Sequence, residues 1–264
     1  MTPPRRAKRV VAIGDLHSGH AAGLTPPSWW ASRKREGWQT IRKLQAAYWR
    51  EYSRLVALYG PCDLLIVNGD GIDGKGERSG GTELLTSDRR EQVDMASACI
   101  KPWRAAKICM TYGTGYHVGR EEDWEHILAD KVGADIRSHL WVDINGCTFD
   151  VKHKVGSSSI PHGRYTALAR SRLWNMLWAA RKLQPAARVV LRSHVHYHAH
   201  CGDAHGVAMT LPALQAAHTK YGARECEGTV DWGIVVFDIA ADGGMTWKAE
   251  TYDAAALAES ALIV

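Results

Sequence analysis

The chain has 264 residues, 45% of them hydrophobic, and its 33 Lys and Arg against 28 Asp and Glu give a net charge of +5. Such a chain can bury a substantial core, and its mild basic charge is compatible with anionic substrates or nucleic acid without establishing either. The basic residues 1–9 precede an apolar run that Gly14 and Asp15 break, so we expect neither a signal peptide nor a membrane span.

The cysteines indicate a reducing compartment. None belongs to a CxxC pair, and several lie inside apolar runs, where a reduced thiol behaves as a small hydrophobic side chain. We therefore expect a cytoplasmic protein without membrane association. The six cysteines are Cys62, Cys99, Cys109, Cys147, Cys201 and Cys226.

Three apolar runs form the framework of the chain, because each is followed directly by carboxylate or imidazole residues. A short apolar run bounded by turn residues is typical of a strand covered on both faces, and ligands of open α/β sheets collect beyond the carboxyl ends of such strands. We therefore expect these strands to bring metal-ligating side chains to one place. The runs and their following residues are 10–13 with Asp15 and His17, 64–68 with Asp70, and 189–192 with His194 and His196.

The segment after the first strand is rich in Gly and Pro, which indicates a loop over residues 18–30. Residues 18–37 could form a cap over the site. Trp29 and Trp30 either wall a substrate pocket or fasten the loop to the body.

Apolar residues at helical spacing predict four helices along the chain. The second of them is interrupted near its end by Pro102, and a strand is predicted at 107–112. In the last helix, Trp174 and Trp178 are four residues apart and are expected in the core. The predicted helices are 38–58, 88–106, 121–132 and 165–183.

Two alternating runs, 140–144 and 147–153, flank Asn145 and Gly146, which is a strong hairpin signal. His153 ends this hairpin. Neither an internal repeat nor a linker divides the sequence, so we expect a single domain over 1–264. Later runs predict antiparallel strands of a second sheet at 207–211, 229–239 and 245–252.

The candidate ligands combine carboxylates and imidazoles and include no thiolate, which suits Mn, Fe, Zn or Ni better than a structural zinc site. Six ligands are too many for one ion. They suffice for two divalent ions that share a carboxylate, and such pairs lie about 3.5–4 Å apart in enzymes that attack phosphorus. The set consists of Asp15, His17, Asp70, His153, His194 and His196, with His117 nearby in the turn 113–119.

Four further residues could contact a substrate. Lys75 and Arg78 lie in the loop 74–81 at the ligand edge, where a phosphate group could bind. His20 lies in the loop beyond the first ligands, and Tyr116 precedes His117. Each also has an ordinary structural interpretation as a loop residue.

Five motifs follow one another along the chain: Gly14-Asp15-Leu16-His17, Gly69-Asp70-Gly71-Ile72-Asp73, Gly115-Tyr116-His117, His153, and Ser193-His194-Val195-His196. This ordered series resembles that of the calcineurin-like metallophosphoesterases, and the match spans nearly the whole chain. The third motif and the segment after His153 look most like the branch found in bacteriophage and prophage genomes.

The resemblance implies an α/β fold, a four-layer αββα sandwich with two mixed central sheets, and a dinuclear metal centre. It implies hydrolysis of phosphate esters, most readily phosphodiesters, by attack of a metal-bridging hydroxide. It also implies that His117 stabilises developing charge or protonates the leaving oxygen, and that Asp73 orients a ligand. The implied ligand sets are Asp15, His17, Asp70 and His196 for one ion and Asp70, His153 and His194 for the other, with Asp70 as the bridge.

The chain departs from the family at the third motif, where Gly-Asn-His-Asp or Gly-Asn-His-Glu is usual. The asparagine ligand of the second ion is absent, and Tyr116 is a poor substitute while it is protonated. The second ion could bind more weakly, take an extra water, or recruit Thr114 or Asn68. The acidic partner of the catalytic histidine is also missing, and Glu121 or Glu122 could replace it if the loop folds back.

Two alternatives to a phosphodiesterase of small substrates stay open, so the expected partners are a phosphate ester or a nucleic acid. A nuclease would use a basic track to contact the phosphate backbone, although such a charge run is also typical of a solvated helix face. A non-catalytic binding module would keep the fold without the chemistry. The track comprises Arg33, Lys34, Arg35, Arg42 and Lys43.

Overall fold

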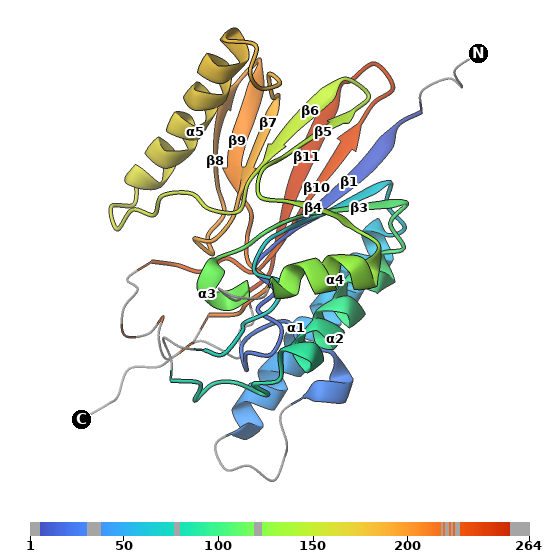
Figure 1. Cartoon of the computed structure of the whole chain (residues 1–264), viewed down its shortest axis with the longest axis vertical. Helices are drawn as coiled ribbons and strands as arrows, with labels where there is room; N and C mark the ends of the chain where they lie inside the picture. The colour runs from blue at the N-terminus through green and yellow to red at the C-terminus, as the bar shows by residue number, and fades with distance from the viewer. Residues whose placement is uncertain are drawn as a thin grey trace.

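Two β-sheets lie face to face at the centre of the molecule, and helices cover the outer side of each (Figure 1). The computed structural model describes residues 6–30, 38–76, 80–118, 123–217, 219, 222, 224 and 228–253. This four-layer arrangement confirms the predicted αββα sandwich with two mixed sheets. None of the described helices is long and apolar enough to cross a membrane.

The first sheet has a parallel centre and an antiparallel edge. Strands β1 to β4 run parallel, so their carboxyl ends share one edge of the sheet, whereas β10 pairs antiparallel with β1 and β11 with β10. In spatial order the strands are β11 (Met245–Thr251), β10 (Gly233–Ile239), β1 (Lys8–Ile13), β2 (Leu64–Asn68), β3 (Lys107–Thr111) and β4 (Asp135–Arg137).

The second sheet has three parallel strands, β6, β7 and β9, between two antiparallel edge strands. The predicted hairpin is confirmed. Asn145 and Gly146 form its turn with φ angles of 54° and 89°, which an Asn-Gly pair accommodates well. In spatial order the strands are β5 (Leu140–Ile144), β6 (Cys147–Val151), β7 (Val189–Arg192), β9 (Gly206–Thr210) and β8 (Ala199–Asp203).

Side-chain alternation along the strands produces the layers. In β1, Val10 and Ala12 belong to the core between the two sheets, whereas Val11 and Ile13 belong to the core under the helices. Successive side chains of a strand point to opposite faces, so a strand that is apolar throughout is buried on both sides. On the other sheet, Val190 packs with Leu168 of α5 in a third core.

The helices follow the predicted segments with shifted ends. Asp88 caps α2 by accepting a hydrogen bond from the Arg90 N–H at 2.8 Å, and the helix ends at Ile100, before Pro102. Residues Lys101–Trp103 form a 3-10 turn instead of continuing the predicted helix. The helices on the first sheet are α1 (Trp38–Tyr59), α2 (Arg89–Ile100) and α4 (Trp124–Val132); α5 (Gly163–Ala180) covers the second sheet, and α3 (Gly115–Val118) is a single turn.

The prediction for the last strands was wrong in part. The run 207–211 does join the second sheet as β9, but parallel to β7, and its antiparallel partner is β8. The runs 229–239 and 245–252 supply β10 and β11, which extend the first sheet beside β1. An apolar run predicts a strand, whereas its partner is chosen by tertiary packing.

The prediction that Trp174 and Trp178 lie in the core was also wrong. Their exposed fractions are 56% and 37%, because α5 buries Ala167, Leu168 and Asn175 against the second sheet and turns the two tryptophans outward. Helical spacing shows that two side chains share a face, but it does not show which face packs.

The loop after β1 is fastened to the body of the protein by its tryptophans. The Trp29 indole donates a hydrogen bond to Glu91 of α2 at 3.1 Å, and the Trp30 indole donates to the Thr25 carbonyl at 3.0 Å. These contacts favour the fastening role over a substrate wall. Residues 31–37 of the predicted cap lie outside the described residues.

Candidate metal centre

The predicted ligands lie at the carboxyl ends of strands from both sheets. Strands β1 and β2 are parallel neighbours in the first sheet, and β6 and β7 are parallel neighbours in the second. Because carboxyl ends of parallel strands share an edge, the two sheets direct these side chains to one place. Following β1 are Asp15 and His17, following β2 is Asp70, following β6 is His153, and following β7 are His194 and His196.

Most of these residues have a left-handed backbone, which non-glycine residues rarely adopt. Such a conformation persists only where surrounding contacts enforce it, and it concentrates at functional sites. Here the Asp15 N–H donates to the Gly69 carbonyl and the His17 N–H to the Asp70 carbonyl, each at 3.0 Å. The φ angles are 50° at Asp15, 45° at His17, 50° at Asp70, 76° at His194 and 55° at His196.

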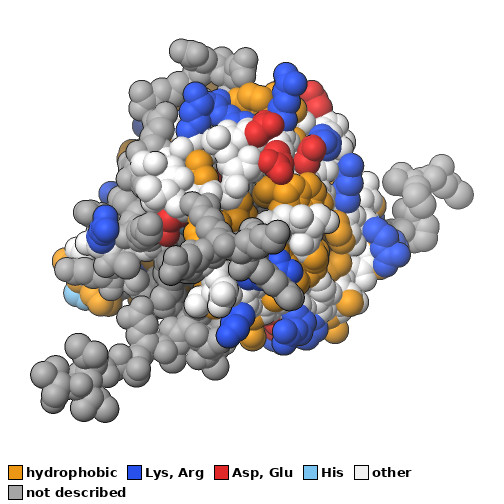
Figure 2. All heavy atoms as spheres, turned by 90° about the horizontal axis from the view of Figure 1, so that it is seen from below, with side chains coloured by type: hydrophobic (Ala, Val, Ile, Leu, Met, Phe, Trp, Pro, Cys, Tyr) orange, Lys and Arg blue, Asp and Glu red, His pale blue; other side chains and the backbone are white. Residues whose placement is uncertain are grey.

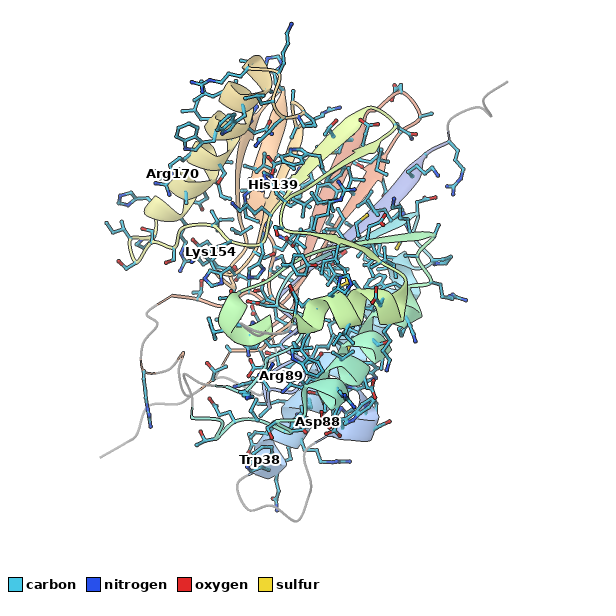
Figure 3. The ribbon with its side chains drawn as sticks, viewed as in Figure 1. Trp38, Asp88, Arg89, His139, Lys154 and Arg170 are labelled. Carbon is cyan, nitrogen blue, oxygen red and sulfur yellow. The ribbon has the colours of Figure 1, made fainter. Side chains whose placement is uncertain are left out.

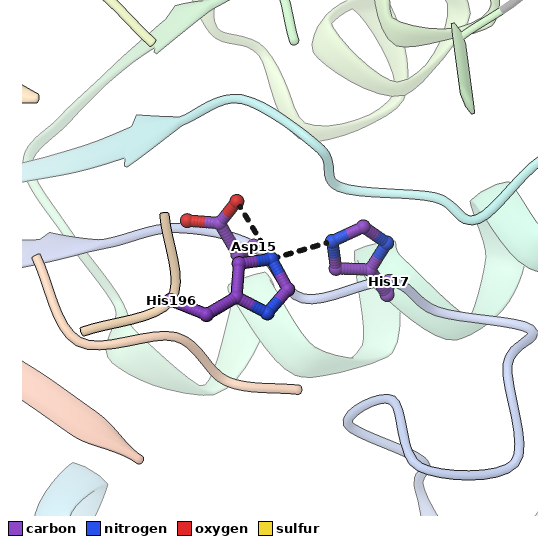
Figure 4. Close-up of side chains that lie close together, drawn as sticks. All are labelled: Asp15, His17 and His196. Carbon is purple, nitrogen blue, oxygen red and sulfur yellow. Dashed lines mark hydrogen bonds and ion pairs between the residues drawn. The ribbon is translucent and has the colours of Figure 1, made fainter. Parts of the chain in front are cut away.

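One cluster consists of Asp15, His17 and His196 (Figure 4). The Nε2 atoms of the two histidines are 3.2 Å apart, and His196 Nε2 lies 3.4 Å from Asp15 Oδ1. Atoms bound to one ion at about 2.1 Å stand about 3.0 Å apart in octahedral and about 3.4 Å apart in tetrahedral coordination. The separations therefore fit ligands of a single metal ion.

A second cluster consists of Asp70, His153 and His194, whose potential ligand atoms all lie within 4.8 Å of one another. His153 Nε2 is 3.0 Å from Asp70 Oδ2, again the separation of two ligands of one ion. The cluster touches the first one, because the His194 N–H donates to the Asp15 carboxylate at 3.2 Å.

A third group, His17, Asp70 and His117, joins the other two. Asp70 belongs to two of the three groups, and so does His17, so the groups overlap. The rings of His17 and His117 meet edge to face at 4.5 Å. The predicted catalytic histidine therefore lies against the predicted metal ligands, although it comes from α3 and not from a strand end.

Hydrogen bonds orient three of the imidazole rings. The Nδ1–H of His17 donates to the Asp73 carboxylate at 3.0 Å, and that of His153 donates to the Asn68 carbonyl at 2.8 Å. His117 Nδ1 donates to the backbone carbonyl of Asp73 at 2.8 Å. Because these oxygens only accept, Nδ1 of each ring carries a proton, so Nε2 is the nitrogen that can bind a metal ion or exchange a proton.

Burial and neighbouring charge set different protonation states in the two clusters. Burial raises the pKa of Asp70, but the charge and hydrogen bond of His153 outweigh burial and hold that pKa below its usual range. Burial lowers the pKa of His153, and the Asp70 charge outweighs it, raising the pKa to about 10. Burial and the charge of His117 lower the pKa of His17 to about 4. His17 is therefore a neutral ligand, whereas Asp70 and His153 share a proton that a metal ion would displace.

The predicted substrate residues have unequal surroundings. The Tyr116 ring packs against the His117 ring at 4.0 Å. His20 is 4% exposed, accepts a hydrogen bond from the Ala22 N–H and lies 3.6 Å from Glu83, so it holds its own loop and has little surface for a substrate. Lys75 is exposed, and Arg78 lies outside the described residues, as do Glu121 and Glu122.

Glu125 is a site residue that the sequence analysis missed. Its carboxylate is fully buried and accepts hydrogen bonds from the Gly71 N–H at 2.8 Å and the Gly113 N–H at 2.6 Å. Burial, with the Asp70 charge, raises the pKa of Glu125 to about 8. Through these two hydrogen bonds, the Glu125 side chain connects the loop that carries Asp70 with the segment that leads into the third motif. Nothing in the sequence distinguishes it from an ordinary acidic residue in the first turn of a helix.

Comparisons with known proteins rest on structure alone, because no family model and no curated protein sequence matches the chain. Vacuolar protein sorting 29 of Cryptosporidium parvum matches with a TM-score of 0.50 and 11% identity over 94% of this chain and 100% of that chain. A novel archaeal phosphodiesterase matches with 0.43 and 13%, over 92% and 99%. Zinc-complexed Vps29 of Entamoeba histolytica matches with 0.45 and 12%, over 93% and 99%.

The fold is that of a metallophosphoesterase sandwich, with two mixed sheets flanked by helices. At about one identical residue in nine, the likeness to Vps29 concerns the fold. The fold alone therefore does not define the function, which depends on the residues of the site.

Proposed function

We propose that the protein is a dinuclear metal-dependent phosphoesterase that hydrolyses phosphodiesters. The observation that carries this proposal is the meeting of carboxylates and imidazoles in overlapping clusters with separations of 3.0–3.4 Å. A purely structural network does not require several residues in a strained backbone conformation whose imidazole nitrogens and carboxylates point to one place.

The chemistry of the donors fits two divalent transition-metal ions. Mixed oxygen and nitrogen ligands without thiolate suit Mn, Fe, Zn or Ni. Two such ions would lower the pKa of a bound water and offset the charge of the phosphoryl oxygens. The first ion would be held by Asp15, His17, Asp70 and His196 and the second by Asp70, His153 and His194, with Asp70 shared.

The chain's own residues would position the substrate and move a proton. His117 Nδ1 is fixed by the Asp73 carbonyl, which leaves Nε2 beside the clusters to stabilise or protonate the leaving oxygen. Lys152 and Lys154 flank His153 and are exposed, so they can contact an anionic substrate; Figure 3 shows Lys154 on the segment leading to α5. We keep a cytoplasmic location and the bacteriophage-type branch as predictions.

The described residues of the predicted basic track do not by themselves support a nuclease. Of its predicted basic track, Arg33 to Arg35 lie outside the described residues, and the Arg42 guanidinium stacks over the Trp30 ring at 5.3 Å. Figure 2 shows Lys and Arg side chains spread around the margin of the face it presents, with apolar surface between them. A continuous track for a phosphate backbone is not visible on that face.

Hydrolysis of bis-p-nitrophenyl phosphate beside p-nitrophenyl phosphate tests the proposal, after metal removal and separate addition of Mn, Zn, Ni or Mg. We expect metal-dependent cleavage of the diester. In His117→Ala, turnover should fall about 10²- to 10⁴-fold while metal content stays unchanged. No turnover with any metal would favour the non-catalytic binding module, since the fold is shared with a protein named for vacuolar sorting.

A further inference from the structure

The second cluster lacks the asparagine that the family uses at its third motif, and the sequence alone leaves its replacement open. We propose that the Thr114 hydroxyl supplies the missing oxygen ligand of the second metal ion. This inference rests on the proposed dinuclear function and assigns a ligand that differs from the family pattern. It also separates the ligand from His117, which comes three residues later on α3.

The position of the hydroxyl carries the inference. Thr114 Oγ1 lies 3.1 Å from Asp70 Oδ2, 3.1 Å from His194 Nδ1 and 3.4 Å from His153 Nε2. It thus faces all members of the second cluster at once. Each separation lies between the octahedral and tetrahedral values of about 3.0 and 3.4 Å expected for atoms around one ion with bonds of about 2.1 Å.

Without a metal ion the hydroxyl can donate one hydrogen bond and accept two, so the same position also satisfies it in the metal-free protein. A divalent ion can be bound by all four atoms together, because each offers a lone pair once His153 has lost its proton. Hydroxyl oxygens are established ligands of divalent ions in proteins, for example at phosphate-binding loops.

The backbone holds Thr114 in place independently of any ion. Its N–H donates to Asp70 Oδ1 at 2.6 Å, and the preceding Gly113 N–H donates to Glu125 at 2.6 Å. A Cβ at Gly113 would lie 2.1 Å from Asp70 Oδ1, so only glycine permits this approach. The hydroxyl is therefore preorganised beside the shared carboxylate.

Asn68, the other candidate from the sequence, is fully engaged elsewhere. Its amide nitrogen donates to Ser193 Oγ at 2.8 Å, and its carbonyl oxygen accepts from the Thr111 hydroxyl at 2.6 Å. The side chain is fully buried between β3 and the end of β7, so turning it toward the ion would leave two buried polar groups unpaired.

Metal stoichiometry and stepwise affinity test the proposal without reference to turnover. Wild-type protein, Thr114→Val and Thr114→Ser are stripped of metal, equilibrated with Mn²⁺, and measured by elemental analysis and titration calorimetry. Valine keeps the shape without the hydroxyl, and serine keeps the hydroxyl. We expect two ions in the wild type and in Thr114→Ser, and a second ion bound at least about tenfold more weakly in Thr114→Val.

The outcomes separate this inference from the proposed function. Two ions of wild-type affinity in Thr114→Val would overturn the role of Thr114 and leave the dinuclear centre intact. Fewer than two ions in the wild type would overturn both. Melting curves of the metal-free variants serve as the folding control, and Thr114→Asn should restore the second ion because it supplies the family's amide oxygen.

Discussion

The two clusters of the candidate metal centre share only the end of β7, and their residues are held differently. In the first, which consists of Asp15, His17 and His196, the Asp73 carboxylate orients His17. In the second, a backbone carbonyl orients His153, and the Thr114 hydroxyl lies 3.1 Å from His194 Nδ1. The geometry of the first cluster therefore depends on a side-chain hydrogen bond. The geometry of the second depends on the backbone conformation at Gly113, whose N–H donates to Glu125.

The two clusters also differ in the protonation of their histidines. His17 has a pKa of about 4 and is neutral at physiological pH, whereas His153 has a pKa of about 10 and shares a proton with Asp70. A metal ion can therefore enter the first cluster without displacing a proton from His17, and it must displace one from the second. Changes to single residues can test whether the two sites are as different as this comparison suggests.

The largest effect should come from Asp70→Asn, because Asp70 is the proposed shared ligand of the two ions. An amide in place of the carboxylate removes the negative charge between two cations, so both ions should be lost and turnover should fall at least about a thousandfold. Elemental analysis beside the diester assay measures this. Asp238→Asn is the matched control, since Asp238 pairs with Arg9 on the surface. Unchanged metal content in Asp70→Asn would disprove the shared ligand.

Asp73→Ala should weaken the first ion selectively. The substitution removes the carboxylate that orients His17, but the backbone carbonyl that holds His117 stays. Loss of such an outer partner typically reduces metal affinity about 10- to 100-fold. Titration calorimetry should show this loss for one ion, with the other close to wild type. Asp94→Ala, which removes a surface partner of Lys131, is the control. An equal loss at both sites would contradict the comparison.

The affinity of the second ion should depend more steeply on pH. Below the His153 pKa of about 10, binding must release the shared proton, so affinity should rise about tenfold per unit between about pH 7 and 9. The first ion receives no such contribution from His17, whose pKa is about 4. Calorimetry in buffers of different ionisation enthalpy counts the released protons. If the affinities of both ions changed equally with pH, the proposed difference in protonation between His17 and His153 would be wrong.

The smallest effect should follow from Glu125→Gln, which replaces one of two buried acceptors with an amide N–H. The variant should lose about 1–3 kcal/mol of stability, because the N–H of Gly71 or Gly113 is left unpaired. Thermal melting of the metal-free protein measures the loss. Glu51→Gln, which alters an ion pair with Arg54 on α1, should change stability little.

The same variant should also change how stability depends on pH. The folded-state pKa of Glu125 is raised to about 8, so folding favours its protonated form. This contribution is fully present below the ordinary pKa near 4.5 and is lost as pH rises through about 8. Glutamine does not titrate, so the difference in melting temperature between wild type and variant should shrink as pH rises across that window. A constant difference would contradict the raised pKa.

Several features could be predicted from the sequence because they are encoded locally. The apolar runs of β1, β2 and β7 are continuous, and the polar residues after them follow at once, so both the strands and the candidate ligands are visible in the chain. The Asn145-Gly146 turn likewise carries its own conformational preference. The resemblance of the ordered motifs then supplied the sandwich fold, which the structure confirms.

Other features were decided by the tertiary structure, because they depend on which distant segments meet. Strand β10 pairs with β1 and β11 with β10, which no local pattern specifies, and Trp174 is exposed because another face of α5 packs. Glu125 and Thr114 act on Asp70 only because the third motif folds against the end of β2. The sequence by itself determined the strands and the kinds of ligand, since these follow from local polarity and conformational preference. Which strands pair, and which residues meet at the site, depends on packing between segments that are distant in the sequence, so no local pattern predicts it.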